Sequence, residues 1–154
     1  MQRRTFMKGT LAAGSVAVAV GAGLLSPRAV LAAWPKSAFE AKSVQDALTG
    51  LFGSDATSPS SDISIKAPDI AENGAVVPVS VQTGIAGATD ISIIVEKNGV
   101  PLAANFKLKG SAKGFVATRI KMQKTSNVIA VVRAGGKAHS ARKEVKVTIG
   151  GCGG

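Results

Sequence analysis

The sequence predicts an all-β protein, an immunoglobulin-like β-sandwich of about seven strands over residues 62–149, preceded by one N-terminal helix. Two observations predict this fold. From residue 63 onward, apolar and polar residues alternate in short runs with a period of two, which is the period of a strand with one buried face. Turn residues such as Asn98-Gly99 and Gly135-Gly136 separate the runs at the spacing typical of sandwiches.

The segment before the strands, residues 33–53, is predicted to form one helix that packs on the sandwich. Its apolar residues recur at helical spacing and leave a polar face (Phe39, Val44, Ala47, Leu48 and Leu51). Pro35 suits the start of a helix, and Gly53 suits its end. Residues 53–61 are rich in Ser, Asp and Pro, which indicates a loop.

Seven runs define the expected strands: residues 63–67, 77–81, 91–95, 104–108, 116–122, 128–132 and 145–149. The run 128–132 is apolar on both faces, so we expect it in the middle of a sheet. Pro78 has no N–H to donate, which predicts that its strand lies at an edge or holds a bulge. An open edge of this kind is a natural place for a partner to dock.

Residues 1–32 have the features of an export signal. The chain opens with Arg3, Arg4, Phe6 and Lys8 in the order of a twin-arginine signal, followed by an uncharged stretch and small residues around Ala32-Ala33. We therefore expect export of the folded protein to the periplasm, with cleavage after Ala32 or Ala33 and no membrane anchor afterwards. The alternative is an uncleaved anchor, for which the apolar stretch is at the lower edge of the required length.

Composition excludes several classes of site. The chain has one Cys and one His, so it cannot form an internal disulfide or a structural zinc site, and no cofactor or metal is expected. Removing the four basic residues of segment 1–32 from the nineteen in the chain leaves fifteen against nine acidic ones, a net charge of +6. This charge suits an anionic ligand or an acidic partner, but basic residues are not interleaved with aromatics as in nucleic-acid-binding proteins.

The last five residues carry the strongest chemical signal. Cys152 is flanked by Gly150, Gly151, Gly153 and Gly154, which predicts a flexible arm over residues 150–154 with an exposed thiol. A free thiol is a usable nucleophile without being strongly activated. The arrangement is typical of a carrier, which holds a group covalently and presents it to several active sites.

Nearly all of the mature chain resembles the SoxY family of sulfur carriers. Besides the twin-arginine start, three stretches carry the resemblance: residues 65–74, residues 118–122 and the terminal Gly-Gly-Cys-Gly-Gly. The resemblance implies a carrier without catalytic activity that pairs with a SoxZ-like subunit and is exported with it. It also implies covalent attachment of thiosulfate-derived sulfur to Cys152. SoxAX-, SoxB- and SoxCD-like enzymes would dock transiently to load, hydrolyse and oxidise the adduct.

Three other interpretations stay open at the level of sequence. A β-sandwich interaction or assembly module would leave Cys152 incidental. A ubiquitin-like sulfur carrier would use the terminal Gly153-Gly154 as a thiocarboxylate, although the signal and the strand pattern oppose it. An enzyme would have to pair Cys152 with His139, and a dyad on a flexible tail lacks preorganisation.

Overall fold

The computed structural model describes residues 35–148. Its elements are α2 (Lys36–Glu40), α3 (Val44–Phe52), β1 (Ser58–Pro59), β2 (Ile63–Lys66), β3 (Ile70–Ala71), β4 (Val77–Thr83), β5 (Ala88–Val95), β6 (Leu102–Lys107), β7 (Phe115–Ile120), β8 (Ser126–Ala134) and β9 (Lys137–Val147). The predicted signal peptide and carrier arm lie outside the described residues. Between residues 35 and 148, no helix is long and apolar enough to cross a membrane.

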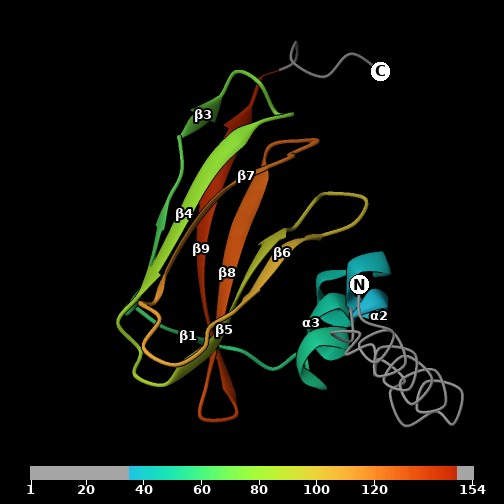
Figure 1. Cartoon of the computed structure of the whole chain (residues 1–154). Coiled ribbons are helices and arrows are strands. Elements are labelled where there is room, and N and C mark those ends of the chain that lie inside the picture. The colour runs from blue at the N-terminus through green and yellow to red at the C-terminus, as the bar shows by residue number, and fades with distance from the viewer. Residues whose placement is uncertain (1–34, 149–154) are drawn as a thin grey trace, which may run out of the picture. The chain divides into compact units, whose positions relative to one another are not determined.

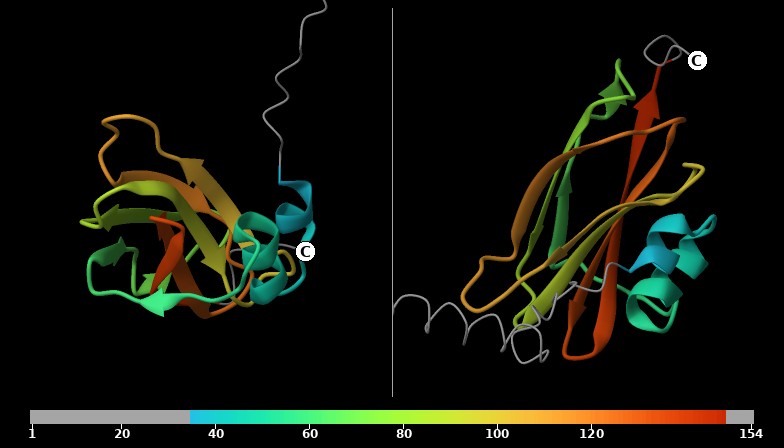
Figure 2. Two further views of the ribbon diagram at one scale, coloured as in Figure 1. Left: turned by 90° about the horizontal axis from the view of Figure 1, so that it is seen from below. Right: turned by 45° about the vertical axis from the view of Figure 1, so that its right-hand side comes forward.

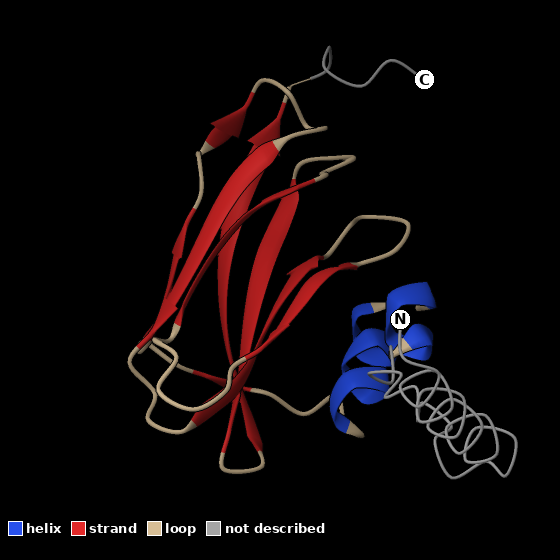
Figure 3. Cartoon of the chain, in the orientation of Figure 1, coloured by secondary structure: helices blue, strands red, loops and turns tan. Residues whose placement is uncertain are grey.

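The strands form two sheets that face each other, which confirms the predicted all-β sandwich (Figures 1 and 3). The larger sheet has the order β1-β9-β8-β5-β6, with β3 also pairing to β9, and the smaller sheet has the order β2-β4-β7. The segment from β1 to β3 changes sheets twice, because β1 and β3 pair in parallel with β9 while β2 pairs with β4.

The core lies between the inner faces of the two sheets and consists mainly of Val and Ile side chains, among them Val79, Val81, Ile91 and Val132. As predicted, residues 128–132 form a central strand, since β8 pairs with β5 on one side and with β9 on the other. Its residues are buried on both faces because α2 and α3 cover the outer face of the larger sheet (Figure 2).

The single helix predicted over residues 33–53 is wrong, because the chain forms two short helices with a break at residues 41–43. Ser43 caps α3, and its hydroxyl accepts a hydrogen bond of 3.0 Å from the backbone N–H of Asp46. Gly50 lets the two helices approach closely, since a Cβ there would lie 2.9 Å from backbone atoms of Ala38. The predicted end at Gly53 is confirmed by its left-handed conformation (φ 76°).

Two predictions about the strands also need correction. The last strand begins at Lys137, directly after the predicted Gly135-Gly136 turn, rather than at residue 145. The short strands β1 and β3 were not predicted, and β1 lies inside the expected loop 53–61.

The predicted edge position or bulge for the strand of Pro78 is wrong, since β4 lies between β2 and β7 and its pairing register is regular at this residue. The N–H of Thr83 points towards β7, where it donates to the carbonyl of Gly114. Successive N–H groups alternate along a strand, so the nitrogen of Pro78 faces the β2 side. β2 ends with Lys66 opposite Ser80, and Pro78 therefore interrupts no ladder.

Candidate functional site

The residues predicted to carry function lie outside residues 35–148. These are Cys152 with Gly150, Gly151, Gly153 and Gly154, and the export residues Arg3, Arg4, Phe6 and Lys8. The structure does describe the base of the arm, which we define as Val147 and Thr148 at the end of β9 together with their contacts. Figure 1 shows β9 and β3 running beside each other at this end of the sandwich.

On one side, β3 holds the base of the arm by parallel pairing, with Ala71 opposite Val147. The N–H of Thr148 donates to the carbonyl of Ala71 at 3.2 Å, and the N–H of Lys146 donates to the carbonyl of Asp69 at 2.9 Å. The hydroxyl of Thr148 also donates to the carbonyl of Glu72 at 3.4 Å. These bonds fix the backbone up to the last described residue.

On the other side, Thr125 takes the place of a strand partner. The N–H of Val147 donates to the Thr125 hydroxyl oxygen at 2.9 Å, just before β8 begins at Ser126. A side chain therefore satisfies a backbone donor that the β8–β9 ladder does not reach, since that ladder ends with Ser126 opposite Val145.

Gly74 lies beneath the base of the arm and is buried. Its carbonyl accepts a 2.7 Å hydrogen bond from the N–H of Met122. A Cβ on Gly74 would overlap the carbonyl oxygen of Met122 and lie 2.8 Å from Cγ1 of Val147. Residues 65–74 and 118–122, two of the three stretches that carry the family resemblance, thus meet next to the strand that leads into the third.

An ion pair braces the same region. The Lys143 ammonium lies 2.9 Å from Oδ1 of Asp69, directly before β3. The hydrogen bond from Lys143 and its positive charge lower the pKa of the Asp69 carboxyl below its ordinary value. Asp69 and Thr125 had no predicted role. Asp69 lies within the stretch 65–74 that resembles the family, whereas nothing in the local pattern singled out Thr125.

The geometry opposes a Cys152–His139 dyad. His139 lies eight residues before Val147 in β9, a distance of about 26 Å at ~3.3 Å per residue. Five residues from Val147 to Cys152 extend at most about 18 Å. Even an arm fully stretched back along β9 would leave the backbone of Cys152 about 8 Å short of His139, which provides no preorganised catalytic geometry.

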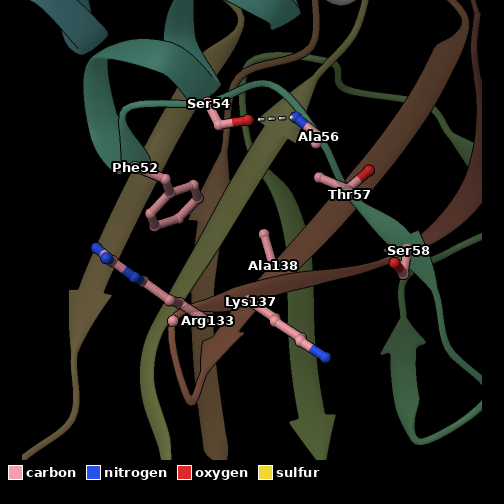
Figure 4. A pocket seen from close by; sticks show the side chains of 9 residues that line it. Phe52, Ser54, Ala56, Thr57, Ser58, Arg133, Lys137 and Ala138 are labelled. Atoms are coloured by element: carbon pink, nitrogen blue, oxygen red, sulfur yellow. Dashed lines mark hydrogen bonds between the residues drawn. The ribbon is translucent and has the colours of Figure 1, made fainter.

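A pocket of about 270 Å³ lies where the end of α3 meets the β8–β9 turn (Figure 4). The Arg133 guanidinium lies over the ring of Phe52, 5.6 Å from its centre, and so ties β8 to α3. The charged ends of Arg133 and Lys137 point in opposite directions, so the pocket does not gather them onto one ligand. Over the described residues, no three His, Cys, Asp or Glu side chains group as metal ligands would.

Comparison with known proteins identifies the family. The model of "Sulfur oxidation protein SoxY" matches residues 48–152, more than half of the chain. The chain belongs to the SoxY family. SoxY proteins act as sulfur carriers in sulfur oxidation, and the described base of the arm lies within the matched range.

A solved SoxY structure gives the same result. The sulfur carrier protein SoxY from Chlorobium limicola f thiosulfatophilum is 50% identical in sequence, with a TM-score of 0.63. The match covers 69% of this chain and 96% of that chain. No protein in the curated set matches the sequence significantly.

Proposed function

We propose that this SoxY-family chain is a periplasmic carrier that holds thiosulfate-derived sulfur covalently on Cys152. The observation that supports the proposal most is the position of the chain's one Cys, between two pairs of Gly and only four residues beyond Thr148. Four extended residues span about 13–14 Å, enough to carry the thiol into the active site of another protein. The firm hold on Val147 and Thr148 gives such an arm a fixed origin.

The chemistry begins with the Cys152 thiolate and thiosulfate. A disulfide bond forms between Sγ and the sulfane sulfur of thiosulfate, and the two electrons released pass one at a time to a haem-containing SoxAX-like enzyme. Water then attacks the terminal sulfonate sulfur in a SoxB-like enzyme, the bond between the two sulfur atoms derived from thiosulfate breaks, and sulfate and protons leave. A persulfide stays on Cys152 for oxidation by a SoxCD-like enzyme. The carrier itself supplies a nucleophile and catalyses none of these steps.

The remaining features of the proposal concern export and assembly. Arg3, Arg4, Phe6 and Lys8 suit twin-arginine export, which carries folded proteins. A folded route allows a SoxZ-like subunit without a signal of its own to be exported as the partner of this chain. The heterodimer would then reach the periplasm already assembled.

Mass spectrometry of the protein isolated from cells oxidising thiosulfate tests the carrier role. We expect a reductant-sensitive sulfur adduct on the C-terminal peptide of the wild type. Cys152→Ser should carry no adduct and stop thiosulfate oxidation, while its thermal unfolding stays that of the wild type. A free thiol, or only a disulfide between two copies, under all growth conditions would instead favour an interaction or assembly module.

A further inference from the structure

A groove of about 480 Å³ is lined by residues from the start of β6, the end of β7, the β5–β6 turn and the break between α2 and α3. Its apolar lining residues are the exposed Val100 and the buried Leu102 and Ile120, and Lys42, Arg119 and Lys121 contribute positive charge. We call it the basic groove. No carboxylate belongs to its lining among the described residues.

The three cations of the basic groove come from two parts of the chain. Lys42 lies in the break between α2 and α3, Arg119 lies on β7 and Lys121 directly follows β7. All three are exposed, and none forms an ion pair with a residue in the range 35–148. Three like charges that line one groove, with no carboxylate in that lining, favour the binding of an anionic partner.

The polar side chains of the groove are already used within the protein. Asn98 donates to the carbonyl of Lys121 at 2.7 Å and accepts from the N–H of Gln123 at 3.0 Å. The side chain of Gln123 accepts from the N–H of Gly99 at 2.8 Å. These bonds hold the β5–β6 turn against the end of β7 and fix the wall of the groove, whose charged recognition groups are the three cations.

Both strands that border the groove have an open edge. β6 is the last strand of the larger sheet and β7 is the last strand of the smaller one. An exposed edge presents backbone N–H and C=O groups to which an extended segment of another protein can add as a strand. The groove therefore fits a polypeptide better than a small free anion.

The groove is also linked to the base of the arm through the segment that follows β7. Lys121 and Gln123 line the groove, and Met122 between them donates to the carbonyl of Gly74. Thr125, two residues after Gln123, binds the backbone of Val147. A protein docked in the groove would thus lie at the end of the sandwich from which the arm extends.

We propose that the basic groove docks an acidic, extended segment of the enzymes that load and unload Cys152. This inference rests on the proposed carrier function and adds the surface that recognises those enzymes. Exposed charges at the edge of an interface, such as these three cations, mainly raise the rate of association, and their effect weakens as salt is added. Docking would then hold the arm beside an active site without tight binding of the small substrate.

The test measures the affinity of the carrier, as its heterodimer, for a purified SoxAX-like enzyme at low ionic strength. All carriers contain Cys152→Ser, so that binding is separated from sulfur chemistry. We expect Arg119→Glu/Lys121→Glu to weaken binding by about tenfold or more. The milder Arg119→Gln/Lys121→Gln should give a smaller loss of affinity. Because it removes the positive charges without adding negative ones, it tests the groove even if the Glu variant folds poorly.

The matched control is Lys109→Glu/Lys113→Glu, which changes the net charge equally at exposed positions in the β6–β7 loop. We expect its affinity to stay within about twofold of the parent carrier. Equal losses in both pairs would show an effect of net charge alone and overturn the proposal, as would unchanged affinity in the groove variants or no binding by the parent.

Hydrogen exchange provides a second readout. We expect the amides of β6 and β7 that face the groove to become protected only when the enzyme is added. Protection already present in the isolated heterodimer would show that the partner subunit covers the groove, and would overturn the proposal. The mass of the Cys152 peptide decides the carrier function separately.

Discussion

Replacing Gly74 by Ala should disturb the base of the arm without touching Cys152. Gly74 does not have a positive φ, so its backbone tolerates a side chain and the effect is one of space. The new Cβ would overlap the carbonyl oxygen of Met122 and lie 2.8 Å from Cγ1 of Val147. Because the first contact is with backbone, a change of rotamer cannot relieve it.

Overpacking of this kind lowers the free energy of unfolding by about 1–3 kcal/mol. At roughly 4 °C per kcal/mol for a domain of this size, the Tm of Gly74→Ala should fall by about 4–12 °C. Thermal and urea unfolding measure the loss, and exchange of the Thr148 amide reports whether the arm loosens at its base. The control is Gly84→Ala, where a Cβ meets nothing within 4 Å and φ is again not positive. Equal stability of the two variants would refute the reasoning.

Two further changes examine the same region. Thr125→Val leaves the N–H of Val147 without its acceptor, so the free energy of unfolding in urea should fall by about 1 kcal/mol, whereas Thr125→Ser should retain most of it. Lys143 lowers the pKa of Asp69, so the ion pair stabilises the fold at pH values above 3.8, the ordinary pKa of this carboxyl group. This stabilisation is lost as the pH falls through the lowered pKa of Asp69. Exchange of the Lys146 amide, corrected for its intrinsic pH dependence, should therefore accelerate in acid, and Asp69→Asn should abolish that acceleration.

Much of the sandwich could be predicted from the sequence because its strands bury one face and expose the other. β9 was predicted only in part, since residues 137–144 are mostly polar and show no regular alternation. Their extended conformation depends on the neighbouring β8, which pairs with β9 from Ala134–Lys137 to Ser126–Val145. Because these residues depend on pairing with β8, their own sequence carries no pattern that predicts a strand.

Other errors have different causes. β1 and β3 have two residues each, too few to show any period, and exist through pairing with β9. The break between α2 and α3 did have a signal, because Ser43 is a good N-cap residue three positions before Asp46. For the candidate site, the thiol could be predicted from chemistry and resemblance alone. The hydrogen bond from the N–H of Val147 to Thr125 joins residues that are 22 positions apart in the sequence, so no local pattern could predict it.

The long ladder between β8 and β9 has a mechanical consequence. In the proposed carrier function, an enzyme that drew the thiol into its active site would pull on the end of β9, and a pull along the strand loads the ladder in shear. The force is then shared among nine residue pairs from Ser126–Val145 to Ala134–Lys137, instead of opening them one after another. The last strand of the sandwich can thus transmit traction from the arm to the whole larger sheet without peeling away.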